Sequence, residues 1–201
     1  MLKATGDCGH GDDSATDGLY QGLLGAEWDE LPAAVRRAHD GRPLSGRGCF
    51  HVRWSRWPWL RGLAWVCGLP RPGVDVPVEL EVEPDASGET WRRRFAGRPF
   101  VTRQWREGPE LIERSGPLEL RFRLRGGTAG LVFEPRGARL GRLPLPAWLS
   151  PRVVASVRGE DELEVAVRLE IPALGELCRY AGRLEVPPEA AAAAPALPGP
   201  R

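Results

Sequence analysis

VDVPVELEV, the stretch from Val74 to Val82, decides the fold. Its apolar side chains occupy every second position, and carboxylates and one proline fill the positions between them. Because successive side chains of a β-strand point to opposite faces of a sheet, this period of two predicts a strand with one buried and one solvated face. Pro77 has no N–H to donate to a neighbouring strand, so it indicates a sheet edge or a β-bulge at that point.

Further segments of strand character follow the same pattern, and breaks such as Ala86–Gly88 and Gly97–Pro99 fit hairpin turns between antiparallel neighbours. A sheet of so many strands would expose an apolar face and two edges unless it curled. We therefore expect a mainly β domain, an antiparallel meander curled into a barrel or half-barrel. The alternative is a helix-grip fold, although no helical period follows Leu163. The other predicted strands are Phe50–Trp54, Thr90–Phe95, Phe100–Trp105, Leu111–Glu113, Leu118–Leu124, Gly130–Phe133, Arg152–Arg158, Leu163–Ile171 and Cys178–Val186.

Helical periodicity is confined to the first third of the chain. Apolar residues recur at three- and four-residue spacing over Leu19–Val35, which predicts a helix. Pro32 cannot sit in a helix interior, so the segment divides into two pieces. The second piece is expected to start near Asp29 or Glu30 and to end near His39.

A second short helix is expected over Pro58–Cys67, because proline suits a first helical turn and Gly68 follows as a stop. This segment is apolar nearly all round, a pattern that predicts burial rather than exposure of one face. We expect it, together with the N-terminal helices, to cover one side of the sheet.

Composition places the strands in a single domain. Residues 1–15 are rich in Gly and Asp and residues 187–201 in Ala and Pro, so both are expected to be disordered, around one β-rich domain over residues 16–186. The four cysteines form no CxxC pair and no secretory signal precedes them, which predicts a cytoplasmic protein with reduced thiols. No apolar run is long enough to span a bilayer. A net charge of +1 gives no field that would attract nucleic acid.

Four tryptophans lie within twelve residues, from the end of the first predicted strand through the short helix, and arginines are interleaved with them. Three interpretations remain open: a core plug at the barrel mouth, a pocket lid or lipid-contacting helix, and a surface that stacks on nucleic acid bases. The absence of a wider basic face argues against the third. These residues are Trp54, Trp57, Trp59 and Trp65.

No motif for catalysis, metal or nucleotide binding stands out. The histidines have no zinc spacing, and a weak Cys8, His10, Asp12, Asp13 grouping lies in the Gly-rich lead-in. We therefore expect no metal and no cofactor. A non-catalytic domain is the favoured interpretation, and an enzyme that uses His39 or a buried glutamate is the alternative.

Four segments together resemble a known family: LYQGLLGAEWDELPAAVRRAH (Leu19–His39), WRRRFAGRPF (Trp91–Phe100), LGRLPLPAWLSPR (Leu140–Arg152) and RYAGRLEV (Arg179–Val186). Their order and spacing are similar to a bacterial family catalogued as domain of unknown function 4166, with coverage from about residue 18 to 187. The resemblance implies no activity. Members look like stand-alone domains or the C-terminal part of chains with a dehydrogenase-like nucleotide-binding module, which implies a possible dehydrogenase-like partner.

Polar residues within these and neighbouring segments are candidates for one pocket at a barrel mouth, where ligand sites commonly lie. Alternatively, Arg152 caps a turn and Tyr180 hydrogen-bonds within the core. With the tryptophans, the candidate pocket residues are His39, Trp54, Trp57, Trp65, Arg94, Gln104, Arg152 and Tyr180.

Two functions follow as hypotheses. The first is a non-catalytic β-barrel that binds an apolar small molecule or lipid, and the second is a structural or interaction module that serves a dehydrogenase-like partner. The first depends on whether the barrel is hollow, which Leu/Val alternation does not decide because the same pattern lines a filled core and an apolar cavity.

Overall fold

The computed structural model describes residues 18–186, so the expected disordered ends, 1–15 and 187–201, lie outside the described residues. The helical elements are α1 (Leu19–Leu24), the 3-10 helix η1 (Gly25–Trp28), α2 (Ala33–Ala38) and α3 (Pro58–Val66). The strands are β1 (Leu44–Trp54), β2 (Gly73–Asp85), β3 (Gly88–Phe95), β4 (Arg98–Glu107), β5 (Glu110–Ser115), β6 (Leu118–Gly127), β7 (Gly130–Leu140), β8 (Leu143–Pro144), β9 (Arg152–Arg158), β10 (Leu163–Ile171) and β11 (Gly175–Glu185).

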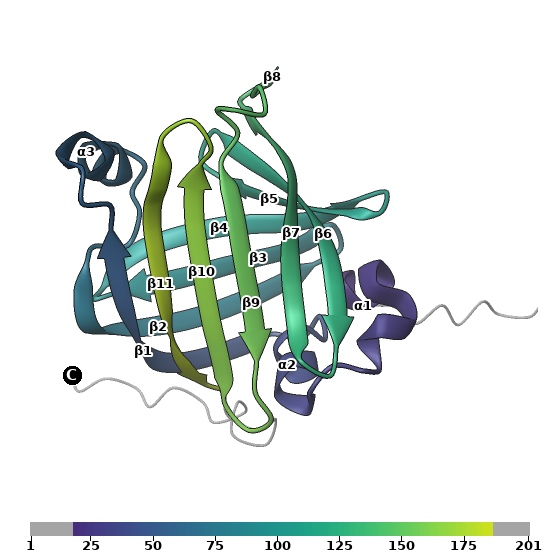
Figure 1. Cartoon of the computed structure of the whole chain (residues 1–201). Helices are drawn as coiled ribbons and strands as arrows, with labels where there is room; N and C mark the ends of the chain where they lie inside the picture. Colours follow the sequence, from purple (N-terminus) through teal and green to yellow (C-terminus); the bar gives the residue numbers. More distant parts are fainter. Residues whose placement is uncertain (1–17, 187–201) are drawn as a thin grey trace, which may run out of the picture.

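Ten of these strands form a closed antiparallel barrel (Figure 1). Strands β1 to β7 pair in chain order, β7 pairs with β9, β9 to β11 continue the order, and β11 pairs with β1. The predicted meander and its ten strands are confirmed, and closure is complete rather than partial. The helix-grip alternative is wrong, because within residues 18–186 no helix follows α3. The two-residue β8, which extends the sheet beyond β7, was not predicted.

Two glycines permit the closure between β1 and β11. Gly182 pairs with Phe50, and a Cβ at Gly182 would collide with the carbonyl oxygen of Cys49 and the backbone of Phe50. A Cβ at Gly48 would likewise collide with the carbonyl of Arg183. Only residues without a side chain allow the two strands to approach so closely. Beside this seam, β1 shifts its register against β2 between Phe50 and Val52. The shift lies next to Pro77 and accounts for that proline within a paired strand.

The N-terminal helices close one end of the barrel, at the lower right of Figure 1. Helix α1 contacts β4 and β6, and α2 contacts β9. The division at Pro32 is confirmed, but the second piece starts later than predicted, because Pro32 is itself the N-cap of α2 and adopts an extended ψ of 147°. Its missing N–H and fixed φ suit the helix boundary. His39 ends α2 as predicted.

Helix α3 projects from the opposite end of the barrel; its predicted start at Pro58 is confirmed, and it ends at Val66, one residue before the predicted end, with Cys67 as its C-cap. The predicted burial is wrong. Leu60 and Ala64 are buried against Leu177, whereas Trp59, Trp65 and Val66 are 54%, 64% and 74% exposed. The helix is attached by one narrow stripe at four-residue spacing, and no other part of the described chain covers its remaining apolar face.

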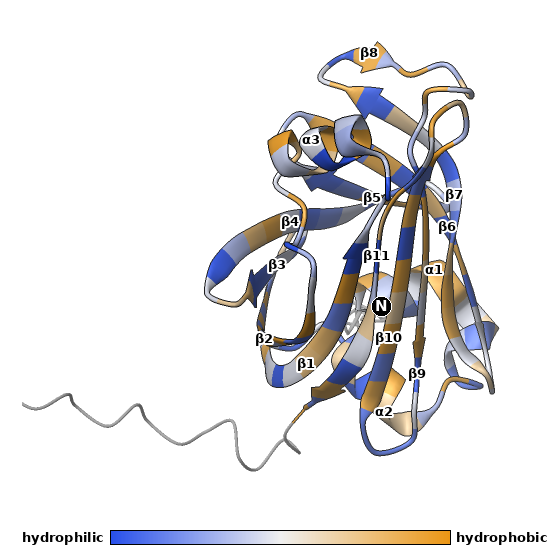
Figure 2. Ribbon diagram, turned by 60° about the vertical axis from the view of Figure 1, so that its left-hand side comes forward, coloured by the Kyte–Doolittle hydropathy of each residue, from blue (hydrophilic) through white to orange (hydrophobic). Residues whose placement is uncertain are grey.

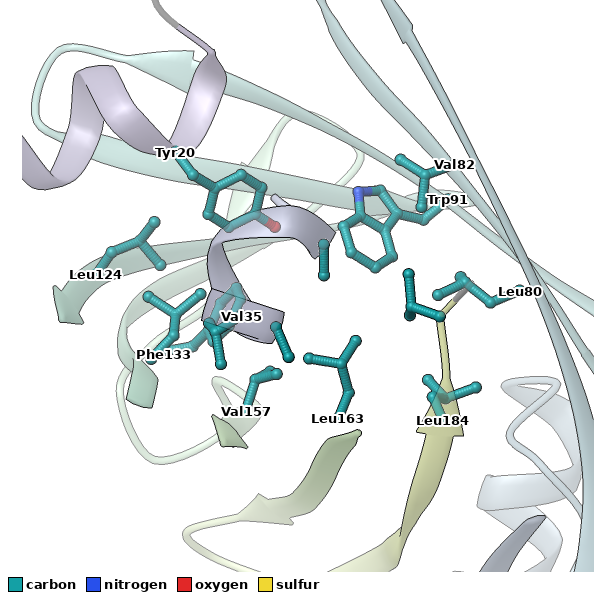
Figure 3. Packing of buried hydrophobic residues seen from close by; sticks show 14 of the residues in the cluster. Tyr20, Val35, Leu80, Val82, Trp91, Leu124, Phe133, Val157, Leu163 and Leu184 are labelled. Atoms are coloured by element: carbon teal, nitrogen blue, oxygen red, sulfur yellow. The ribbon is translucent and has the colours of Figure 1, made fainter. Parts of the chain in front are cut away.

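The main core fills the barrel beneath α1 and α2 (Figure 3). Tyr20 and Val35 reach inward from the helices and meet Trp91, Phe133 and Leu163 from the barrel wall. Hydropathy alternates along the strands that supply these side chains, for example along β10 (Figure 2). The short helices therefore owe their stability to packing, since helices of this length are unstable alone.

The β1–β11 seam makes a first prediction. Replacing Gly182 by Ala should destabilise the domain by roughly 1 to 3 kcal/mol, because the methyl group meets backbone that cannot move aside. Gly137→Ala in β7 is the matched control, since a Cβ there has nothing within 4 Å. Urea unfolding of both variants measures the difference. Equal stability of the two would show that close approach at the seam is not required.

Candidate functional site: the open half of the barrel

The barrel interior is packed at the helical end and partly accessible at the other. On β6 and β9, inward-facing side chains change from buried to partly exposed with distance from α1 and α2, whereas Phe95 on β3 and Cys178 on β11 remain buried toward the other end. On β9, Val157 is buried and Val153 is not; on β6, Phe122 is buried and Leu120 is not. We call the accessible region the open half. Its inward-facing, partly exposed residues include Arg93, Phe100, Glu113, Leu120, Val153, Val165 and Tyr180.

Strands β3, β4 and β5 carry polar side chains on their inner faces. Alternation places Glu89 and Arg93 beside Trp91 on β3, and Thr102 and Gln104 beside Phe100 on β4. Glu113 on β5 lies opposite Gln104 in the strand register. Charged groups inside a barrel are costly unless they are paired or hydrated. We call Glu89, Arg93, Thr102, Gln104 and Glu113 the inner polar cluster.

Arg93 is the only cation of this cluster, and it lies where the open half begins. Its Nη1 donates a hydrogen bond to Thr102 Oγ1 at 3.0 Å and lies 3.7 Å from Glu113 Oε1. The guanidinium carbon is 5.0 Å from the Trp91 ring centre and 6.0 Å from that of Phe100. Both carboxylate and guanidinium keep some exposure, 16% and 19% of their side chains. The pair is thus partly hydrated rather than sealed.

Tyr180 faces Arg93 across the interior from β11. Its ring packs against Phe95 and Phe50, with ring centres 5.6 and 6.0 Å apart. Burial raises the pKa of the Tyr180 hydroxyl to about 12, with the positive charge of Arg93 lowering it and the negative charge of Glu113 raising it. The hydroxyl therefore keeps its proton at neutral pH and remains a hydrogen-bond donor.

Tyr20 and His39 extend the cluster into the packed half. The Tyr20 hydroxyl donates to Gln104 Oε1 at 2.5 Å, and both side chains are buried. His39 Nδ1 lies 2.9 Å from the Val35 carbonyl oxygen, which makes that nitrogen the donor in the neutral ring. Burial lowers the pKa of His39 to about 4. With ring centres 4.4 Å from Tyr20 and 5.5 Å from Trp91, the imidazole is an uncharged packing element.

Glu89 is the member of the cluster with a buried oxygen that lacks a hydrogen-bond partner among the described residues. Trp91 Nε1 donates to its Oε2 at 3.0 Å, whereas its buried Oε1 has no hydrogen-bond partner among the described residues. Burial raises the pKa of Glu89 to about 7, the Trp91 hydrogen bond lowers it, and the charge of Asp40 raises it further. A carboxyl group in this environment holds its proton near neutral pH.

A pocket of about 240 Å³ lies at the mouth of the open half, below α3. Trp54 ends β1 there, and its Nε1 donates to the Pro70 carbonyl oxygen at 2.7 Å, which fixes the chain that follows α3. We call this hollow the mouth pocket. Its walls are mainly apolar, and two arginines stand among them: Trp54, Trp65, Leu69, Pro70, Arg71, Phe95, Arg98, Pro99 and Phe100, with Gly68.

A second hollow, of about 430 Å³, lies on the barrel wall formed by β1, β11, β10 and β9. Alternation places most of its side chains on the outer face, among them His51, Arg53, Arg168 and Arg179. This hollow is separate from the mouth pocket.

The structure brings some of the predicted pocket residues together. Trp54 and Trp65 line the mouth pocket, and Gln104 and Tyr180 have the inward parity of their strands, although Tyr180 borders the second hollow and not the mouth pocket. His39 was predicted to belong to the same pocket, but the structure places it deeper in the barrel, where it is buried beneath the N-terminal helices.

Three predicted pocket residues lie elsewhere. Arg94 is on the outer face of β3, 3.7 Å from Glu79 and 3.5 Å from Glu81. Arg152 is exposed at the start of β9. Trp57 is about half exposed, stacked under the Arg56 guanidinium, and is not part of the mouth pocket.

Sequence reasoning missed Arg93, although a signal was present. In WRRRF, Trp91 and Phe95 mark the inward face, and Arg93 shares their parity. Three consecutive arginines conceal that one of them must point inward. Glu113 is covered only by the general alternative of a buried glutamate, and Thr102 and Glu89 carry no signal beyond their place in an alternating strand.

The described residues contain neither a helix long and apolar enough to cross a membrane nor a cluster of three or more His, Cys, Asp or Glu side chains placed to hold a metal. The weak Cys8, His10, Asp12, Asp13 grouping lies outside the described residues.

The raised pKa of Glu89 leads to the prediction that the stability of the fold depends on pH. Its pKa in the folded state, about 7, is above its ordinary value of 4.5, so the protonated form stabilises the fold at low pH and this contribution is lost as pH rises through 7. Glu89→Gln keeps a neutral side chain at all pH values. We expect the variant to gain about 3 kcal/mol relative to the wild type between pH 4.5 and pH 8, measured by urea unfolding at both. A difference that does not change with pH would contradict a protonated Glu89.

The Tyr20–Gln104 hydrogen bond predicts a coupled pair. Tyr20→Phe leaves the buried Gln104 amide without its donor and should destabilise the fold by about 1 to 3 kcal/mol. Adding Gln104→Leu removes the orphaned amide and should restore part of the loss. Thermal unfolding of both single variants and the double variant measures the coupling, and strictly additive effects would rule it out.

Comparison with known proteins adds one relationship. The sequence model of the family described as domain of unknown function (DUF4166) matches residues 31–184, which span α2 and the whole barrel apart from the last residue of β11. Helix α1 and η1 precede the matched segment, so the resemblance expected from Leu19 onward extends beyond it. No curated protein and no solved structure matches the chain. On the family match, which covers more than half of its length, the chain belongs to the DUF4166 family.

Proposed function

We propose that this domain binds an apolar small molecule or single-chain lipid in the open half of the barrel, without carrying out chemistry on it. The observation that supports the proposal most is the division of the interior into a packed and an accessible half. A barrel with no ligand to hold could have filled both halves with side chains.

The lining of the open half suits a ligand with a long apolar part. Phe100, Val153 and Val165 offer apolar surface inside, and Trp54 and Trp65 continue it to the mouth pocket. Small-molecule sites are commonly concave and apolar with a few convergent polar groups. The inner polar cluster supplies those few groups on one wall.

The electrostatics favour binding over acid–base catalysis. A general base must reach a substrate proton within hydrogen-bond distance. His39 is buried under the helices with one nitrogen directed at the Val35 carbonyl, and Glu89 lies on the packed side of Arg93. Arg93, Glu113 and Tyr180, which border the open half, are suited to hold a polar head group.

A second candidate function has its own observation. Trp59 and Val66 on α3, with Leu143 and Trp148 near β8, expose large apolar side chains around the same end of the molecule. Such surfaces often mark contact with another protein. This supports an interaction module that serves a partner, with a dehydrogenase-like protein as the partner that the family resemblance implies. Copurification from the native host at native expression tests it, and recovery of no dehydrogenase-like protein would count against it.

Tryptophan variants test the pocket. 1-Anilinonaphthalene-8-sulfonate, an apolar anion, should bind the wild type with increased fluorescence, and Trp65→Ala should weaken its binding about five-fold or more because an apolar wall of the mouth pocket is lost. Trp59→Ala is the matched control, because Trp59 is exposed to a similar extent on the same helix, 54% against 64% for Trp65, but lies outside the pocket. Native mass spectrometry after incubation with a bacterial lipid extract should show a bound species in the wild type. Equal loss in both variants would assign the probe to the surface of α3, and no binding at all would overturn the proposal.

A further inference from the structure

One edge of the Arg93 guanidinium has no hydrogen-bond partner among residues 18–186. Both of its contacts, Thr102 Oγ1 and Glu113 Oε1, are made by Nη1. Within residues 18–186, the buried side-chain nitrogens and oxygens that lack a hydrogen bond are Glu89 Oε1, Glu119 Oε1 and Arg121 Nε. Nε and Nη2 of Arg93 are not among them and have no hydrogen bond in the described chain, so they remain accessible to water. An inward-facing arginine thus presents free donors to the open half.

These two donors lie on the same edge of the guanidinium. Nε–H and Nη2–H point in parallel, which is the geometry that receives both oxygens of a carboxylate in two hydrogen bonds. The remaining edge, at Nη1, is held by Thr102 and Glu113, and the plane is held by Trp91 and Phe100. The guanidinium is therefore oriented before any ligand arrives, which reduces the entropy lost on binding.

Tyr180 supplies a further donor on the opposite wall. Its hydroxyl makes no hydrogen bond in the described chain. Because it is not one of the buried atoms that lack a partner, it is accessible to water, as the free edge of Arg93 is. Because burial raises its pKa to about 12, it keeps the proton that it would donate. Tyr180 packs against Phe95, with ring centres 5.6 Å apart, and Arg93 lies two residues before Phe95 on the same inward face of β3, so the two groups border one region of the interior.

The charges favour a monoanion. Arg93 carries one positive charge that Glu113 compensates only partly, at 3.7 Å and with partial exposure. A carboxylate adds one negative charge against the free edge, whereas a doubly charged phosphate would add a second charge next to Glu113 without another cation of the inner polar cluster to balance it. Phe100 lies opposite Arg93 in the strand register and also lines the mouth pocket, so an apolar chain attached to the carboxylate would pass along Phe100 toward Trp54 and Trp65.

We propose that the open half binds a single-chain carboxylate amphiphile, such as a medium-chain fatty acid, with the carboxylate between Arg93 and Tyr180 and the chain directed to the mouth pocket. The inference rests on the proposed function and specifies its ligand. Arg93 and Tyr180 are binding residues in it, and Glu113 and Thr102 are positioning residues.

Isothermal titration calorimetry with decanoate and with 1-decanol, at pH 7.5, separates the head group from the chain. The wild type should bind decanoate more tightly than 1-decanol. Arg93→Met should weaken decanoate binding about ten- to a hundred-fold, the effect of losing a charged pair of hydrogen bonds, and leave 1-decanol binding within about two-fold. Tyr180→Phe should weaken decanoate binding several-fold. Arg94→Met, the neighbouring arginine on the outer face, is the matched control and should bind both probes as the wild type does.

The outcomes distinguish the inference from the function beneath it. Binding of neither probe overturns both. If both probes bind equally and Arg93→Met changes neither affinity, the apolar site is supported and the proposed recognition of a carboxylate is overturned. If Arg93→Met binds neither probe because the barrel does not fold, Arg93→Lys decides, since lysine keeps the charge and loses the two-donor edge. Decanoate affinity that falls in Arg93→Lys while 1-decanol affinity is retained supports the inference, and wild-type decanoate affinity overturns it.

Discussion

Closure of the sheet between β1 and β11 is the constraint on which the rest of the structure depends. Glycines at Gly48 and Gly182 let the two backbones approach, and the pairing of β11 with β1 then gives every barrel strand two neighbours. Closure removes exposed edges and turns one face of ten alternating strands into an interior. Helices α1 and α2 cover one end of that interior, so its two ends acquire different properties from a single continuous wall.

Polar side chains have different environments at the two ends of the interior. Beneath the helices, Tyr20 is hydrogen-bonded to Gln104, His39 is uncharged, and burial raises the pKa of Glu89 to about 7, so that its carboxyl group is protonated below that pH. Arg93 and Glu113 form an ion pair at the border of the open half, where both side chains keep some exposure. Because a charge costs least where it can be hydrated, their position follows the accessibility of the interior. The same position makes them available to a ligand.

Much of the fold could be predicted because it depends on the spacing at which apolar residues recur along the chain. A period of two identified the ten barrel strands, and Pro32 and Pro58 marked helix boundaries through the geometry of proline alone. The site was harder to predict, since it depends on which of several like residues faces inward. In WRRRF, Arg94 was chosen although it faces solvent, and Arg93, which faces the interior, was missed. The exposure of α3 also escaped prediction, because composition shows that a helix is apolar but not that part of it lacks a covering partner. Whether the interior is filled depends on where the helices lie at one end of the barrel. The alternation of apolar residues along the strands carries no information about that placement.

The half-open interior is tested most directly by nuclear magnetic resonance of methyl-labelled protein with unlabelled decanoate, through isotope-filtered nuclear Overhauser effects. Contacts are expected from the chain to the methyl groups of Val153 and Val165, which face the open half, and none to Leu163 or Leu184 in the packed half. Val154, exposed on the outer face beside Val153, is an internal control. Contacts confined to Val153 and Val165 would agree with a barrel that is packed at one end and accessible at the other. Contacts to Val154 without Val153, or to Leu163 and Leu184, would contradict it.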